Sequence, residues 1–148
     1  MGKISDFTFS TKLRKEVELM DFIQEVRNAI NAAVTAQVAK VESTGQTGDI
    51  ASTTIFIPDT EWFFRVSVYM ITTTTGTGTL TCTIAYTDPE GAKTISPAAS
   101  VDLSDASGGS TGNEFIVSAA SAISFSTAIA GKAGNPQYAI YILLEQIG

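Results

Sequence analysis

The sequence predicts a mainly β protein with one long N-terminal α-helix, in which an antiparallel, jelly-roll-like β-sandwich of 7–8 strands follows the helix. Three observations predict this fold. Apolar residues recur at helical spacing before residue 42, they alternate with polar residues after residue 53, and turn residues separate the alternating segments. A chain of 148 residues is long enough to bury a real core in one domain.

The N-terminal third is predicted to be a helix over residues 11–42, preceded by an extended arm over residues 1–10. Ser10 or Thr11 can cap the helix, and neither Pro nor Gly interrupts the segment that follows. Four acidic residues lie in its first half, where the helix dipole favours negative charge. The small polar residues of "ESTGQTGD" predict a linker over residues 43–52.

This helix carries an apolar stripe with steps of four and three residues. The stripe consists of Leu19, Ile23, Val26, Ile30, Ala33 and Gln37. Such a heptad pattern is typical of a helix that associates with copies of itself, so we expect a trimeric bundle. A Gln in the seam would pair with its symmetry copies and fix their register. The alternative is an α+β domain in which the helix packs on its own sheet.

The head domain is expected over residues 53–148, where apolar and polar residues alternate. The turn "DPEG" at residues 88–91 has the Pro and Gly positions of a type I turn. We expect strands over residues 53–58, 61–75, 79–87, 92–96, 99–103, 114–119, 122–130 and 136–146. The strand over 79–87 places threonines between its apolar residues, which suits an outward face that stays soluble without charge.

Two strands carry apolar residues on both faces. The expected core face consists of Trp62, Phe64, Val66, Val68 and Met70, together with Tyr138, Ile140, Ile142 and Leu144. The opposite face carries Phe63, Tyr69, Ile71, Ala139, Tyr141 and Leu143. A monomer would expose this second set as an apolar patch, so we expect Tyr69 and Tyr141 to lie in the trimer interface. Aromatic residues scattered over a sheet surface are the alternative.

The charge distribution argues against nucleic-acid binding. The net charge is −6, and all of it lies in residues 43–148, because residues 1–42 hold six acids and six bases. A phosphate backbone would be repelled by the acidic part. No apolar run approaches the ~20 residues of a membrane span, so membrane insertion is not expected.

We find no catalytic constellation in the sequence and expect a protein that is not an enzyme and has no cofactor. The chain has no His, which removes the common triads and most zinc sites. Cys82 is the only cysteine and lies on the apolar side of its strand, as a small core residue does.

The acidic turns are candidate metal sites. Asp88 and Glu90 could ligate calcium, but Asp88 more often caps its own turn, and the same holds for Asp102 and Asp105. No metal site is therefore predicted. Arg65 stands inside an apolar strand and either pairs with an acid across an interface or extends its head to solvent.

Residues 54–148 resemble a module found near the C-termini of tailed-bacteriophage virion proteins. The likeness lies in "FFRVSVY", the Gly/Thr hairpin, "TIAYTDPEG", "AISFSTAIAG" and "GNPQYAIYILLEQIG". The resemblance implies a virion surface protein, a homotrimer with a β-sandwich head, and it supplies no active-site residue. The family includes head-decoration, head-fibre, tail and baseplate proteins.

Within this family we favour a capsid decoration or short head-fibre protein, because the sequence has no long shaft between the helix and the head. It would be made in the host cytoplasm and lie on the virion surface. Its partners would be copies of itself and the major capsid protein or another virion protein, contacted by residues 1–18. The residues expected to anchor it to the capsid are Phe7, Phe9, Lys12, Arg14 and Lys15.

Two rival functions remain open. A tail or baseplate receptor-binding protein would recognise a host cell-surface glycan with loops such as 104–113 and 131–136. Exposed aromatic rings would favour it, but Trp62 and Tyr138 are both expected in the core. A carbohydrate-active enzyme would need a pair of carboxylates ~5–10 Å apart, and the chain offers only acids in turns.

Overall fold

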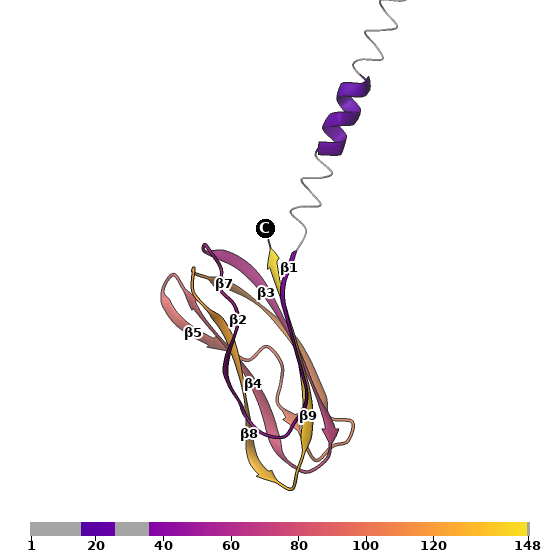
Figure 1. Cartoon of the computed structure of the whole chain (residues 1–148), viewed down its shortest axis with the longest axis vertical. Coiled ribbons are helices and arrows are strands. Elements are labelled where there is room, and N and C mark those ends of the chain that lie inside the picture. Colours follow the sequence, from indigo (N-terminus) through magenta and orange to yellow (C-terminus); the bar gives the residue numbers. More distant parts are fainter. Residues whose placement is uncertain (1–15, 26–35, 148) are drawn as a thin grey trace, which may run out of the picture. The chain divides into compact units, whose positions relative to one another are not determined.

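The structure is a computed structural model that describes residues 16–25 and 36–147. The chain divides into two units, with the boundary between Val34 and Thr35. In the first unit, residues 16–25 form a helix (Figure 1). No helix among the described residues is long and apolar enough to span a membrane.

The second unit is a sandwich of two antiparallel sheets (Figure 1). Sheet A has the strand order β1-β9-β3-β7, and sheet B has the order β2-β8-β4-β5, with the short β6 paired to β4. The strands are β1 (Ala36–Gln46), β2 (Ile50–Phe56), β3 (Trp62–Thr74), β4 (Thr77–Asp88), β5 (Gly91–Ile95), β6 (Val101–Asp102), β7 (Gly109–Ser118), β8 (Ile123–Ala133) and β9 (Gln137–Ile147). A four-stranded and a five-stranded sheet whose connections cross from one to the other form a jelly-roll-like sandwich, so the predicted sandwich is confirmed.

The core lies between the two sheets and is built from the alternating apolar residues of the central strands. Phe64, Val66, Val68 and Met70 of β3 are buried, as predicted. The buried residues of β9 are also those expected, namely Tyr138, Ile140, Ile142 and Leu144. Cys82 is fully buried among them on β4.

The helix prediction is wrong for residues 36–42, because these residues belong to strand β1. β1 pairs with β9 along its length and completes sheet A. Ala39 and Val41 pack against the core from this strand. The backbone pairing and the apolar burial that β9 offers outweigh the modest local preference for a helix.

A β-bulge explains why these residues mimic a heptad. Gln37 lies opposite Glu145 and Lys40 lies opposite Leu143, with a register shift between Gln37 and Ala39. The extra residue places Gln37 and Lys40, three apart in sequence, on the same face of the sheet. Gln37 therefore lies on a sheet surface and is not part of a helical seam.

The predicted linker over residues 43–52 is also wrong, since most of it lies in β1 and β2. Only residues 47–49 connect the two strands, and they carry the chain from sheet A to sheet B. This turn is held by long-range hydrogen bonds: the Tyr138 hydroxyl donates to the Gly48 carbonyl (2.8 Å), and the Ile129 amide donates to Asp49 Oδ1 (2.8 Å). The small polar residues 47–49 therefore form a tight turn that connects the two sheets.

The predicted stripe of the helix is only partly within the described residues. Leu19 and Ile23 lie four residues apart in the helix over 16–25, so they share a face, and their side chains are 57% and 51% exposed. Val26, Ile30 and Ala33 lie outside the described residues, as do the residues expected to anchor the chain, Phe7, Phe9, Lys12, Arg14 and Lys15.

Candidate functional site

The outer face of sheet A combines large apolar side chains with a hollow. The register sets its residues in rows, because directly opposed residues share a face. The central rows are Gln37–Glu145–Arg65–Phe115, Lys40–Leu143–Ser67–Asn113 and Glu42–Tyr141–Tyr69–Thr111, and Phe63 lies beside Ile147 and Val117 at the end where β3 begins. Phe115 and Phe63 are the most exposed rings of this face, at 68% and 61%.

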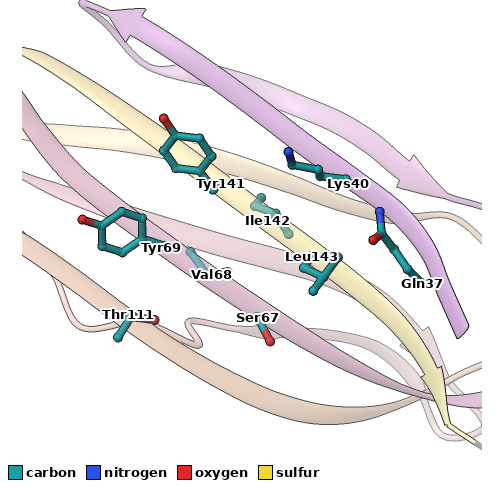
Figure 2. A pocket seen from close by; sticks show the side chains of 9 residues that line it. All are labelled: Gln37, Lys40, Ser67, Val68, Tyr69, Thr111, Tyr141, Ile142 and Leu143. Atoms are coloured by element: carbon teal, nitrogen blue, oxygen red, sulfur yellow. The ribbon is translucent and has the colours of Figure 1, made fainter. Parts of the chain in front are cut away.

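The two tyrosines predicted in the interface come together on this face. The rings of Tyr69 and Tyr141 stack with centroids 6.0 Å apart and an interplanar angle of 30°. Figure 2 shows them side by side on β3 and β9. The structure places them in contact within one chain, and their role between copies stays a prediction.

The hollow lies next to these tyrosines and has a volume of about 380 Å³. Four strands contribute to its lining, which consists of Gln37, Lys40, Ser67, Val68, Tyr69, Thr111, Tyr141, Ile142 and Leu143. Ser67 is the short residue of its row, between Leu143 and Asn113, and so leaves space beside the two rings. Gln37 and Lys40 bring amide and ammonium groups to one side of the hollow (Figure 2).

The charges of this face are paired within the chain. Arg65 Nε donates to Glu145 Oε2 at 2.7 Å, and Lys40 Nζ donates to Glu42 Oε2 at 3.1 Å. Arg65 therefore pairs with an acid of its own chain, an arrangement that neither expectation named, and its side chain stays 38% exposed. Its partner is the directly opposed residue on β9. The face carries two cations and two anions and is neutral.

The outer face of sheet B has the opposite character. On β2, β4, β5 and β8 its directly paired, outward positions carry only small residues: Thr54, Thr79, Thr81, Thr83, Ala85, Thr87, Ala92, Thr94, Ser124, Ser126, Ala128 and Ala130. None of these positions holds a charge or a large apolar side chain, and the short β6 adds the carboxylate of Asp102 opposite Thr79. The hydroxyls bond locally, as Thr81 Oγ1 does to the Ala128 carbonyl (3.4 Å). This face can remain in water at little cost.

The carboxylates of the acidic turns accept hydrogen bonds from residues of the same turn. Asp102 Oδ1 accepts hydrogen bonds from the amide and hydroxyl of Ser104 (2.9 and 2.8 Å), and Asp105 accepts the equivalent pair from Ser107. These bonds lower the pKa of both carboxyl groups below the ordinary value. A general acid needs a raised pKa, so these groups are unsuited to that role at neutral pH.

Other candidate chemical groups have structural surroundings. Burial raises the pKa of the Cys82 thiol to about 12, so the thiol stays neutral. Asp88 Oδ1 accepts the amide of Glu90 at 2.8 Å, which is the turn-capping contact expected for it. Within residues 16–25 and 36–147, no group of three or more His, Cys, Asp or Glu residues is placed to hold a metal ion.

One aromatic residue differs from its expected place. Trp62 is 40% exposed, so the prediction that it is fully used in the core is wrong. It lies at the first position of β3, directly opposite Ser118 at the last position of β7. A second, smaller hollow of about 130 Å³ adjoins it, lined by Phe56, Pro58, Asp59, Thr60, Trp62, Phe64 and Gln146.

Sequence reasoning missed Phe115 and Ser67 as members of the outer face of sheet A. The segment "EFIVSA" has a recognisable alternation, but both of its faces contain an apolar residue, and the inward one is Ile116. Ser67 gives no signal of its own, because a hollow arises from the larger neighbours on three other strands. Only the register brings these residues together.

Comparisons with known proteins concern the fold. No protein-family model and no curated protein matches the chain. The solved PRD1 vertex protein P5 matches with a TM-score of 0.50 and 14% identity, over 76% of this chain and 99% of that chain. At such an identity the likeness describes the architecture and leaves function to other observations.

Two further structures match less closely. A chain of the infectious bursal disease virus VP2 subviral particle matches with a TM-score of 0.46 and 19% identity, over 77% of this chain and 32% of that chain. A chain of the acidic stable capsid structure of Helicobacter pylori bacteriophage KHP30 matches with a TM-score of 0.45 and 12% identity, over 76% of this chain and 91% of that chain. This chain thus spans about a third of the VP2 chain.

Proposed function

We propose that the chain is a non-enzymatic structural protein of a virion, a homotrimeric capsid decoration or short head-fibre protein. It attaches to the shell through its N-terminal arm and helix and displays the jelly roll on the outside of the particle. The observation that carries this proposal is the jelly roll itself, which matches the PRD1 vertex protein P5 over nearly the whole of that chain. The sequence resemblance to phage virion modules supports the same conclusion.

Exposed apolar surface in the first unit supports attachment through the N-terminal region. The helix over residues 16–25 exposes five apolar side chains, Val17, Leu19, Met20, Phe22 and Ile23, each more than half accessible. Most of the stability of a helix in water comes from packing of its apolar face, so this exposed apolar surface favours a partner. Copies of the helix, a shell protein, or both would supply that partner.

Binding to the particle tests the proposal. Purified full-length chain would be added to particles depleted of it and then located by electron microscopy. The variant Lys12→Glu/Arg14→Glu/Lys15→Glu should lose most of the binding, because it reverses the charge of the expected anchor. The matched control Lys132→Glu changes a cation of the sandwich and should bind as the parent does. Density inside the shell, or unchanged binding of the triple variant, would contradict the proposal.

A second candidate is a tail or baseplate protein that recognises a host cell-surface glycan. The observation that favours it is the exposed Trp62 ring beside Asp59, Thr60 and Gln146, since sugars bind by stacking on a ring and hydrogen bonding to polar neighbours. Binding to a glycan array that Trp62→Ala removes and Phe63→Ala retains would support this role. Equal binding by both variants would reject Trp62 as the glycan contact.

A further inference from the structure

The outer face of sheet A carries both a projection and a recess of matching chemistry. Phe115 projects from β7 at one edge of the sheet and is 68% exposed. The hollow around Ser67 lies over the middle of the sheet: β9 and β3 contribute most of its lining, and β1 and Thr111 of β7 contribute the rest (Figure 2). Phe115 is not among the lining residues, so its own ring does not fill the hollow.

The hollow has room for an aromatic ring. Its volume is about 380 Å³, whereas an apolar cavity of about 150 Å³ accommodates benzene in another, well-studied protein. The stacked rings of Tyr69 and Tyr141 and the side chain of Leu143 provide apolar walls. An inserted phenyl ring would meet these rings at the offset or edge-on geometry that aromatic pairs prefer.

The positions of projection and recess allow a head-to-tail contact. Phe115 lies directly opposite Arg65, and Ser67 lies two residues further along β3, so Phe115 and Ser67 are diagonal neighbours about 7–8 Å apart. Phe115 stands on the edge strand β7, so a rotation between copies can bring its ring over the hollow of the next copy. A head-to-tail contact forms a ring where the rotation between copies closes, and the homotrimer of the proposed function requires a ring of three.

Charge allows copies of this chain to meet through this face. The chain has a net charge of −6, so copies repel one another in general. The outer face of sheet A is neutral, because the Arg65–Glu145 and Lys40–Glu42 pairs cancel within it. Packing this face against a copy therefore brings no uncompensated charge into the contact.

The area of the face is close to that of a stable interface. Four strands about 4.8 Å apart and about ten residues long, at ~3.3 Å per residue, cover ~600 Å² before side-chain relief is counted. A stable complex buries about 800 Å² on each partner. In a ring of three this face meets two neighbours, so its area is divided between two contacts that hold the ring together jointly.

We propose that Phe115 of one copy inserts into the hollow around Ser67 of the next copy, and that three such contacts close a ring about an axis beside sheet A. This inference rests on the homotrimer of the proposed function and names the surface that forms it. The hydroxyl-rich outer face of sheet B then points away from the axis.

Disulfide trapping between single-cysteine variants tests the contact. Chains carrying Ser67→Cys and Phe115→Cys, each with a different tag, would be co-expressed, oxidised and separated without reductant. A mixed disulfide dimer is expected, because the two thiols lie within bonding distance only across the interface. The native Cys82 does not interfere, since it is buried and its thiol stays neutral. The control pairs Thr83→Cys, on the outer face of sheet B, with Phe115→Cys.

The result that supports the inference is a mixed dimer in the first pair at least tenfold more abundant than in the control. Equal yields in both pairs, or none in the first, would overturn it. A second variant guards against loss of association in Phe115→Cys: Ser67→Phe fills the hollow from within and should reduce the trimer to monomer, while Thr83→Phe should not. A trimeric Ser67→Phe protein would also overturn it.

The two proposals fail separately. A chain that attaches to the outside of the particle but gives no mixed dimer would retain the proposed function and lose this contact. A chain that forms the mixed dimer and does not bind the particle would retain the contact and lose the proposed function.

Discussion

The outer faces of the two sheets have the same backbone geometry and very different chemistry. The outer face of sheet B consists mainly of threonine, serine and alanine side chains, which water can solvate directly. Sheet A turns outward Phe63, Phe115 and the Tyr69–Tyr141 pair around a hollow. Apolar patches of this kind on a monomer mark interaction sites, so the outer face of sheet A is the one that we propose to meet a partner.

The largest expected effect is on the oligomeric mass, when carboxylates are added to the outer face of sheet A and, for comparison, to the outer face of sheet B. Phe63→Glu/Phe115→Glu should reduce the assembly from three copies to one, because carboxylates buried in an apolar contact without partners are strongly unfavourable. Thr81→Glu/Thr83→Glu adds the same charge to the outer face of sheet B and should leave the mass unchanged. Light scattering on both variants measures this. An unchanged mass for the first variant would remove sheet A from the interface.

The next effect distinguishes the two sides of sheet A itself. Ile142 and Leu143 are neighbours on β9, but Ile142 points into the core and Leu143 lines the outer hollow. Ile142→Ala should lower the free energy of unfolding by about 2–5 kcal/mol, because it leaves a cavity. Leu143→Ala, compared in the Phe63→Glu/Phe115→Glu monomer, should cost less than about 1 kcal/mol. Urea denaturation measures both, and equal losses would contradict the assigned faces.

A smaller effect is expected at the hydrogen bonds that tie the two sheets together. The buried Tyr138 hydroxyl bonds to Thr127 Oγ1 (2.6 Å) and donates to the Gly48 carbonyl (2.8 Å). Tyr138→Phe keeps the ring and should cost about 1–2 kcal/mol of unfolding free energy. Tyr141→Phe changes a ring of the outer face and serves as the control.

The same residue predicts a pH dependence. Burial raises the pKa of the Tyr138 hydroxyl above its ordinary value of about 10. The unfolded chain therefore loses this proton more readily, and the contribution of Tyr138 to stability, full below about pH 10, is lost as the pH rises through the raised pKa. Tyr138→Phe should show a shallower loss of stability above pH 10. Equal slopes in the two proteins would contradict this assignment.

Much of the sandwich could be predicted from the sequence, because alternation is strong wherever a strand has one buried face. The core residues of β3 and β9 follow from period two alone, with Trp62 as the exception at a strand end. The placement of Tyr69 and Tyr141 on the opposite face also follows from alternation. The face on which each of these residues lies depends only on its position along its own strand, so the alternation of apolar and polar residues predicts it.

The start of the sandwich could not be predicted in this way. In β1 a bulge replaces the period of two with a step of three, so Gln37 and Lys40 read as the continuation of a helix. The strand exists because β9 pairs with it, and that partner lies about a hundred residues later in the chain. The Arg65–Glu145 pair and the hollow around Ser67 depend on the same long-range register.

The mass of the purified full-length chain in solution tests the central claim most directly. One copy has a mass of 15.6 kDa, so a trimer has a mass of about 47 kDa. Light scattering over a hundredfold range of concentration should give the trimer mass with little dissociation at its upper end. A mass of 15.6 kDa that persists at the highest concentration would contradict the account, because the outer face of sheet A would then remain uncovered by any second copy.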